Sequence, residues 1–186
     1  METIYVKNMV CDRCINTVKS IFQSHDIHPQ TVKLGEVMLS EKLNSREMAL
    51  IDKSLQEVGF EIIDSGTPVL VLKIKSALIQ VYNQEYISEE FKLSHFLTQK
   101  FPYDYSHLSR IFSQHEKGTI EQYFIKLRIE KAKELLNYKE SNISEVAYRL
   151  GYASAAHFSR QFKKMVGVSP SEFRRNPQNR NSLEDL

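Results

Sequence analysis

A six-residue pattern occurs twice in this chain of 186 residues, at two positions fifty residues apart. The first copy runs from His107 to Phe112 (HLSRIF), and the second runs from His157 to Phe162 (HFSRQF). At helical spacing, the apolar residues of each copy form one stripe, and the Ser and Arg between them point away from it. One such pattern is common by chance, but two copies in similar surroundings indicate two related helical units in one chain.

The face that carries the Ser-Arg pair has the chemistry of a DNA reader, because arginine can donate two hydrogen bonds to guanine in the major groove. The charge distribution agrees with this interpretation. Residues 1–64 hold 7 Lys/Arg and 10 Asp/Glu, a net charge of −3, whereas residues 65–186 hold 18 and 13, a net charge of +5. Nucleic-acid binding requires the basic half to be the one with the repeat, although solvated helices are often this basic.

The chain has the length of one large or two small domains, and 41% hydrophobic residues suffice for packed cores. A polar segment with Gly and Pro, residues 65–68, lies where the composition changes and predicts a linker. The expected domains are therefore 1–64 and 69–175, followed by a polar, disordered tail at 176–186. No stretch reaches the length of a membrane span, and the first seven residues lack signal-peptide features, so we expect a cytoplasmic protein without membrane contact.

The first 64 residues alternate between strand and helix patterns. Strands are expected at 3–7, 31–34, 37–40 and 60–63, and amphipathic helices at 12–24 and 46–58. The order βαββαβ predicts a ferredoxin-like domain, with two helices on one face of a small antiparallel sheet. From Pro68 onward the strong segments have helical patterns. The predicted fold class is therefore α+β, a ferredoxin-like domain followed by an all-α tandem helix-turn-helix domain.

The only two cysteines, Cys11 and Cys14, form a Cys-x-x-Cys between the first strand and the first helix. A helix start has positive potential, which lowers a thiol pKa and stabilises the thiolate. Two neighbouring thiolates can hold a soft ion such as Cu(I), or zinc if further ligands arrive. An intracellular setting disfavours a permanent disulfide, so a reversible thiol–disulfide switch is the alternative interpretation.

Residues 8–14 (NMVCDRC) resemble the Gly-Met-x-Cys-x-x-Cys loop of the heavy-metal-associated domain of copper chaperones and metal-transporting ATPases. Residues 58–60 (VGF) resemble the Gly-aromatic close of that domain, and the resemblance covers about residues 1–64. It implies a soft-metal site, for Cu(I) or another ion such as zinc, at Cys11 and Cys14. Asn8 replaces the usual glycine, and Asn tolerates unusual backbone angles better than most residues. Met9 is expected in the core beneath the loop rather than as a ligand.

The basic half resembles the DNA-binding domain of AraC/XylS-type transcription regulators over about residues 75–175. The matching segments are 108–112 (LSRIF), 127–136 (LRIEKAKELL), 143–147 (ISEVA), 151–152 (GY), 157–164 (HFSRQFKK) and 167–170 (GVSP). Helices are expected at 69–82 and 91–100, and Asp104 and Ser154 are expected to cap the two recognition helices. The resemblance implies that the chain binds double-stranded operator DNA.

A connecting helix at about 119–137 would be nearly 30 Å long at about 1.5 Å per residue. Successive major grooves on one face of a duplex are about 34 Å apart, so one chain can reach both with some DNA bending. Ala132, Leu135 and Leu136 form the expected packing side of this helix. Four basic residues are expected to be solvated charges on it: Lys126, Arg128, Lys131 and Lys133.

The base-contacting positions that the family implies fall on Ser106, Ser109 and Arg110 in the first unit, and on Ala155, Ala156, His157, Ser159 and Arg160 in the second. Lys163 and Lys164 suit contacts to the DNA backbone. Ala155 and Ala156 offer at most contacts to thymine methyl groups, so the second unit is expected to read less sequence. The alternatives are a phosphate clamp for Arg160 and an intramolecular ion pair for Arg110.

Together these features predict a sequence-specific transcription regulator with a metal-sensing domain, which also meets the transcription machinery. The alternatives are the same regulator under a thiol–disulfide switch, or a metallochaperone-like protein whose basic half docks on other proteins. An enzyme is disfavoured, because the six histidines are scattered and Gly-rich phosphate loops are absent from the sequence. The sequence leaves open the operator, activation versus repression, and whether the protein is a monomer or a dimer.

Overall fold

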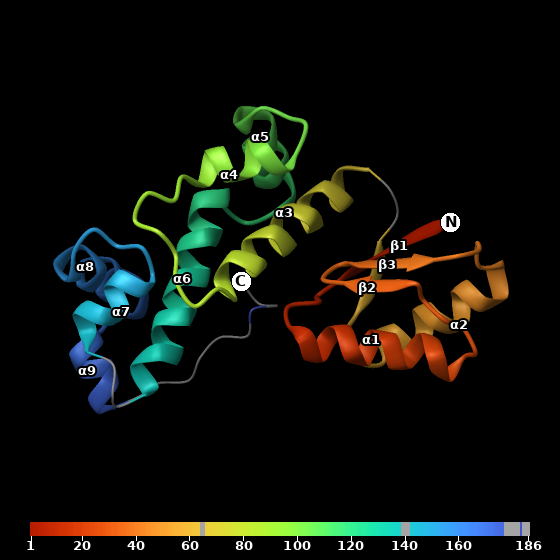
Figure 1. The fold of residues 1–186 in the computed structure, drawn as a ribbon, viewed down its shortest axis with the longest axis horizontal. Helices are drawn as coiled ribbons and strands as arrows, with labels where there is room; N and C mark the ends of the chain where they lie inside the picture. The colour runs from red at the N-terminus through yellow and green to blue at the C-terminus, as the bar shows by residue number, and fades with distance from the viewer. Residues whose placement is uncertain (64–65, 139–141, 177–182, 184–186) are drawn as a thin grey trace. The chain divides into compact units, whose positions relative to one another are not determined.

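The computed structural model describes residues 1–63, 66–138, 142–176 and 183 (Figure 1). The chain divides into two compact units, Met1–Ala77 and Leu78–Leu186. None of the helices in the described ranges is both long enough and apolar enough to cross a lipid bilayer. Of the predicted tail at 176–186, only residues 176 and 183 lie within the described part of the chain.

The first unit is a small antiparallel sheet with helices. Its elements are β1 (Glu2–Lys7), α1 (Asp12–Ser24), β2 (Thr31–Lys33), β3 (Glu36–Leu39), α2 (Ser45–Gln56) and β4 (Glu61–Ile63). The strands lie in the order β2-β3-β1-β4, and each neighbouring pair is antiparallel. The predicted succession of strands and helices is confirmed, with differences of one or two residues at several ends.

Successive side chains along each strand of this sheet point to opposite faces. Ile4 lies opposite Val37 in the β1–β3 register, and both are buried. Helices α1 and α2 lie together on one side of the sheet (Figure 1) and bury Val18, Phe22, Ile51 and Leu55. Tyr5 and Glu36 form the next pair of the register and occupy the opposite face. The first core therefore lies between the sheet and its two helices.

Helix α3 (Thr67–Tyr82) belongs to both units, since Thr67–Ala77 is part of the first and Leu78–Tyr82 is part of the second. Within the first unit, Lys73 pairs with Glu36 at 3.2 Å and lies 5.0 Å from the centre of the Tyr5 ring. The two compact units divide at 77/78, and the linker expected at 65–68 stays a prediction. Pro68 does not prevent an earlier helix start, because the first turn needs no N–H donor at that position.

The second unit is helical in its described residues. It contains α4 (Leu93–Lys100), α5 (Tyr105–His115), α6 (Ile120–Asn137), α7 (Ile143–Arg149), α8 (Ala155–Val166) and α9 (Pro170–Arg175). Helices α4 and α5 lie beside the first part of α6, and α7 to α9 surround its second part (Figure 1). The 18 residues of α6 give it a length of about 27 Å. This long helix carries one helix-turn-helix unit near each end.

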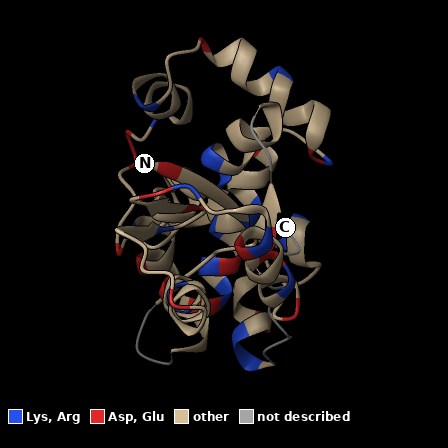
Figure 2. Cartoon of the chain, turned by 90° about the vertical axis from the view of Figure 1, so that its right-hand side faces the viewer, with Lys and Arg blue, Asp and Glu red and all other residues tan. Residues whose placement is uncertain are grey.

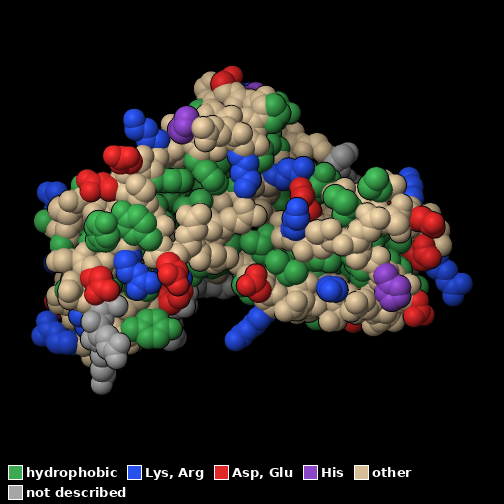
Figure 3. Space-filling view, in the orientation of Figure 1, with side chains coloured by type: hydrophobic (Ala, Val, Ile, Leu, Met, Phe, Trp, Pro, Cys, Tyr) green, Lys and Arg blue, Asp and Glu red, His purple; other side chains and the backbone are tan. Residues whose placement is uncertain are grey.

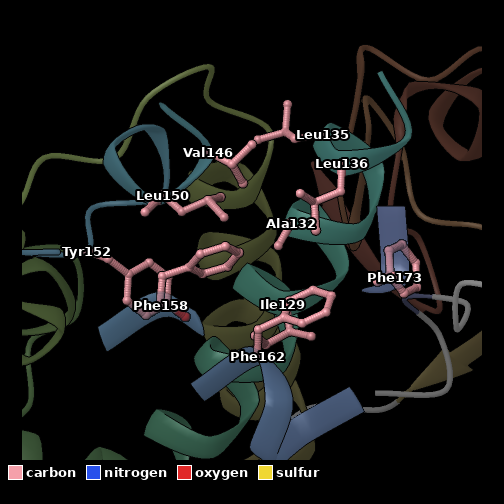
Figure 4. Close-up of a cluster of buried hydrophobic side chains, with 11 residues drawn as sticks. Ile129, Ala132, Leu135, Leu136, Val146, Leu150, Tyr152, Phe158, Phe162 and Phe173 are labelled. Atoms are coloured by element: carbon pink, nitrogen blue, oxygen red, sulfur yellow. The ribbon is translucent and has the colours of Figure 1, made fainter. Parts of the chain in front are cut away.

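The core around the second part of α6 is built from apolar residues of four helices, which point toward one another (Figure 4). Predicted members are confirmed: Ala132, Leu135, Leu136, Val146, Ala147, Leu150, Phe158 and Phe162 are buried. Tyr152 and Phe173 join them without having been predicted, and α9, which carries Phe173, starts with a capping box between Ser169 and Glu172. Phe158 and Phe162 thereby fix α8 against α6.

A short segment before α4, residues 85–88, lies against the end of α7. The backbone N–H of Ile87 donates to the carbonyl of Arg149 at 2.8 Å, and Nε of Arg149 donates to the carbonyl of Glu85 at 3.4 Å. Tyr86 and Tyr148 add a ring contact with centroids 5.1 Å apart, and both side chains are exposed. Figure 3 shows that hydrophobic side chains, drawn in green, reach the surface at several places. This segment therefore braces the second helix-turn-helix unit.

The close approach of residues 85–88 to the turn before α8 requires a glycine at position 151. Its φ is +69°, a left-handed conformation that side chains disfavour. A Cβ atom at this position would lie 2.9 Å from the carbonyl oxygens of both Ile87 and Ser88. The glycine is needed both for its own backbone angle and for room beneath the 85–88 segment.

Candidate functional site

The first recognition helix, α5, begins at the predicted cap. Oδ1 of Asp104 accepts a hydrogen bond from the backbone N–H of His107 at 2.8 Å and from the hydroxyl of Ser106 at 2.5 Å. These bonds, with that from Ser106 the larger cause, lower the pKa of the Asp104 carboxyl. The cap prediction is confirmed. Ser106 is exposed at the helix start, but its proton is directed to Asp104 rather than to solvent.

The rest of α5 has the predicted two-sided character. Leu108, Ile111 and Phe112 are buried, Ser109 is half-buried and Arg110 is exposed. Nη2 of Arg110 lies 3.5 Å from Nδ1 of His107, whose ring stacks on Tyr103 with centroids 4.9 Å apart. No ion pair of Arg110 is found among the described residues, in contrast to the alternative of an intramolecular ion pair. Its side chain is therefore available on the exposed side of α5.

The second recognition helix, α8, repeats this construction. The Ser154 hydroxyl accepts from the backbone N–H of His157 at 3.2 Å, so the second predicted cap is confirmed. Phe158 and Phe162 are fully buried, Ser159 is half-buried and Arg160 is exposed. The same Ser-Arg face is thus turned away from the core in both copies.

The remaining candidate residues of α8 lie at its two ends. Ala155 is half-buried, whereas Ala156 and His157 are exposed, and the His157 ring meets Tyr152 edge-on with centroids 5.5 Å apart. Lys163 and Lys164 are exposed in the last turn, before the helix ends at Gly167 with φ of +90°. Two cations at a helix C-terminus are favourable to the helix dipole in any protein, with or without a phosphate nearby.

The connecting helix corrects one prediction from the sequence. Lys133 was expected to be solvated, but it is only 6% exposed and pairs at 2.7 Å with Glu130, which is 2% exposed. Lys131 likewise pairs with Glu134 at 3.0 Å. Figure 2, with Lys and Arg in blue and Asp and Glu in red, shows charges of both signs on the helices of the chain. The spacing of three residues brings each lysine beside a carboxylate on its own helix.

Arg128 on α6 was also expected to be solvated, and this is wrong. Its guanidinium carbon lies 3.7 Å from the centre of the Tyr152 ring and 5.8 Å from that of Phe124. The sequence did not indicate this contact. One sequence feature was overlooked, namely that an aromatic residue, Tyr103 or Tyr152, precedes each recognition helix. In the structure, each of these rings contacts a histidine in the first turn of the helix that follows it.

The two cysteines come together in the first unit. Sγ of Cys11, at the start of α1, lies 3.4 Å from Sγ of the buried Cys14. Burial raises the pKa of the Cys14 thiol and outweighs the backbone hydrogen bonds that lower it. The expected lowering of the thiol pKa at the helix start is therefore wrong for Cys14. Within the described ranges, no cluster of three or more His, Cys, Asp or Glu side chains suited to a metal ion is present.

The loop before the cysteines has the backbone that its sequence suggested. Asn8 adopts φ of +72°, and its side-chain amide donates to the carbonyl of Gly59 at 2.9 Å. Met9 is 2% exposed, so its predicted place in the core is confirmed. Phe60, which follows Gly59, is also buried. The segment at 59–60 therefore lies beside the loop that leads into Cys11.

One family match lies within the second unit, and the relatives found match over a larger part of the chain. Residues 97–176 match a family described as "Helix-turn-helix domain". The HTH-type transcriptional activator RhaR of Mannheimia succiniciproducens is 30% identical over 157 residues, which are 84% of this chain and 54% of that protein. The HTH-type transcriptional activator RhaS of Escherichia fergusonii is 29% identical over 144 residues, 77% of this chain and 46% of that protein. The chain thus spans about half the length of these relatives.

Among solved structures, the C-terminal domain of AraT, a response regulator from Geobacillus stearothermophilus, is similar with a TM-score of 0.50 and 29% identity. The match covers 59% of this chain and 87% of that one. The curated relatives are transcriptional activators by name, in agreement with the expectation that this chain is not an enzyme. The two capped helices, the connecting helix between them and these matches lead to one conclusion. The second unit contains a helix-turn-helix domain similar to that of HTH-type transcriptional activators.

Proposed function

We propose that the chain is a cytoplasmic transcription regulator that places α5 and α8 in successive major grooves of an operator. The observation that carries this proposal is the repeated construction of the two helices, each capped at its start, anchored by buried apolar residues and exposing an arginine. An exposed arginine on an anchored helix can bond guanine in a fixed register. The connecting helix, about 27 Å long, suits grooves about 34 Å apart if the DNA bends toward the protein.

Arg110 and Arg160 test this proposal most directly, on an operator first selected from a random-sequence DNA library. Arg110→Ala is expected to weaken operator binding by about 1–3 kcal/mol and to relax preference at one base pair, because a bidentate contact to guanine is lost. Arg160→Ala is expected to change base preference less than Arg110→Ala does. The neighbouring Ala155 and Ala156 offer at most contacts to thymine methyl groups, so the second unit distinguishes few bases. Binding of each variant to all four bases at every operator position measures both effects.

A double substitution, Lys163→Ala with Lys164→Ala, is the control for contacts that do not depend on sequence. It is expected to weaken operator and random DNA alike and to reduce the salt dependence of binding by about 0.9 for each lost phosphate contact. If Arg110→Ala behaves in this way too, Arg110 holds a phosphate and the base-reading role is wrong. If the wild-type protein selects no sequence from the library, the operator proposal itself fails.

We further propose that the first unit senses a soft metal ion, Cu(I) in preference to zinc, through Cys11 and Cys14. Two sulfur atoms 3.4 Å apart on a helix start and its preceding loop fit a soft, low-coordinate ion. Zinc in structural sites has four protein ligands, and the described residues supply no such cluster. A ferredoxin-like, heavy-metal-associated-like interpretation of the unit is supported by its strand order and by Met9 beneath the loop.

A thiol–disulfide switch is the second candidate, favoured by the same sulfur–sulfur contact. A disulfide needs the two atoms at about 2.0 Å, so the two sulfur atoms would have to approach each other by about 1.4 Å. A metallochaperone-like protein is less well supported, because it leaves the two exposed arginines without a role. Thiol titration across a series of glutathione redox buffers, with and without Cu(I), separates a metal site from a redox site.

Metal sensing makes a reciprocal prediction. If Cu(I) at Cys11 and Cys14 changes operator affinity, operator DNA must change Cu(I) affinity by the same factor, typically about 5–150-fold in allosteric proteins. Competition of the reduced protein with a chromogenic Cu(I) chelator, with and without the selected operator, measures this factor. Cys11→Ser and Cys14→Ser are expected to abolish both Cu(I) binding and its effect on DNA. Equal Cu(I) affinities in the two titrations contradict the sensor and leave a passive metal site.

A further inference from the structure

Arg128, on the connecting helix α6, is held in an environment that is unusual for a charged side chain. Its Nε and Nη2 atoms are buried and have no hydrogen-bond partner in the described part of the chain. Burial also lowers the pKa of the guanidinium group. What the side chain does contact is the face of Tyr152, at 3.7 Å from the ring centre. A guanidinium plane stacks on an aromatic face far better than an ammonium group does, so this contact specifically suits arginine.

Tyr152 links Arg128 to the second recognition helix, because it contacts both. It is 4% exposed and stands in the turn before α8. Its hydroxyl donates to Oε1 of Gln161 at 2.6 Å, and its ring meets the edge of His157 with centroids 5.5 Å apart. His157 and Gln161 are four residues apart and therefore lie on one face of α8. Tyr152 thus holds that helix at two points, one turn apart.

We propose that Arg128 is a positioning residue for DNA recognition, which sets the orientation of α8 through Tyr152. The first copy of the repeat holds the same face differently, because Ile111 replaces Gln161 and is buried. In the second copy, Gln161 instead accepts a hydrogen bond from Tyr152, and the Tyr152 ring contacts Arg128 on α6. The inference rests on the proposed function only in requiring that α8 bind DNA.

The test compares Arg128→Lys and Arg128→Met with the wild-type full chain on selected operator DNA and on random DNA. Lysine keeps the charge but loses the planar stacking, whereas methionine keeps only the length of the side chain. Lys131→Met is the matched control, since Lys131 is on the same helix and also lies over a tyrosine, Tyr82, at 5.1 Å. That ring belongs to α3 and not to the turn before α8.

Both Arg128 variants are expected to lose operator affinity on the order of tenfold, as expected for loss of a desolvated cation–π contact. Nuclease protection should weaken over the half of the operator bound by α8 and persist over the half bound by α5. Random-DNA affinity and the salt dependence should stay as in the wild type. In NMR spectra the ring protons of His157 should shift in Arg128→Lys, because Tyr152 moves relative to them. Lys131→Met should leave the protection pattern and the His157 signals unchanged.

Three results would overturn the inference. Equal losses on operator and random DNA, with a salt dependence reduced by about 0.9, make Arg128 a phosphate contact. An unchanged operator affinity in a folded Arg128→Lys protein means that the stacking on Tyr152 is irrelevant to recognition. If Lys131→Met loses nuclease protection over the same operator half, the loss of a positive charge on α6 explains the effect. If Arg128→Met does not fold, Arg128→Lys decides alone. A wild-type protein that binds no DNA refutes the proposed function instead.

Discussion

Replacing Glu130 with leucine is expected to lower the free energy of unfolding of the second unit by about 3–5 kcal/mol, because it leaves a buried charge without its partner. Glu130 and Lys133 are 2% and 6% exposed, and their charged atoms are 2.7 Å apart. The burial of Lys133 limits the access of water to its ammonium group once the carboxylate is lost. Urea unfolding followed by circular dichroism measures the change.

The double substitution Glu130→Leu with Lys133→Met is the control for this experiment. Replacing both members of a buried ion pair by apolar residues is often neutral or stabilising, so part of the lost stability is expected to return. If Glu130→Leu alone costs less than about 1 kcal/mol, the pair behaves like an exposed one and its burial does not matter. If the double variant is as unstable as the single one, the loss comes from the packing of leucine.

Phe158→Ala is expected to have an effect of similar size, about 3–5 kcal/mol, through a cavity in the second core. The side chain is fully buried, and its ring contacts those of Tyr152 and Phe162 at centroid distances of 5.3 and 5.6 Å. Since Phe158 anchors α8, the protection of one operator half should weaken as well. Equilibrium unfolding and nuclease protection of the same protein measure the two effects.

Two comparisons make this result interpretable. Phe158→Leu fills most of the volume and is expected to cost clearly less than Phe158→Ala. Leu108→Ala removes the fully buried residue at the matching position of the first copy, and should weaken protection over the other operator half. Loss of both halves in either alanine variant would mean that the two helix-turn-helix units do not bind independently.

Local features of the sequence were sufficient for the succession of helices and strands and for the caps of the recognition helices. Asp104 and Ser154 act within three residues along the chain, so their partners are fixed by the sequence alone. The periodicity of apolar residues likewise placed Phe158 and Phe162 in the core. The DNA contacts and the metal ion stay predictions, because each depends on a second molecule.

Contacts between distant segments were the part that the sequence could not supply. Helical spacing left Arg128 on a polar side of α6, and nothing in the pattern linked it to Tyr152, 24 positions later. The contact of Lys73 on α3 with Glu36 on β3 likewise joins residues far apart in the sequence. For Cys14, the helix start was visible in the sequence, but the burial that raises its pKa was not.

The segment at 85–88 determines where a shortened DNA-binding protein can begin. The match to the helix-turn-helix family starts at residue 97, so a fragment cut there retains both recognition helices but loses the partner of the Arg149 carbonyl. The turn at Gly151 would lose the backbone that covers it, and water would reach the loop before α8. A fragment that begins at Leu78 keeps this cover. The shorter fragment should therefore exchange the amide protons of α7 and α8 with solvent faster than the longer one.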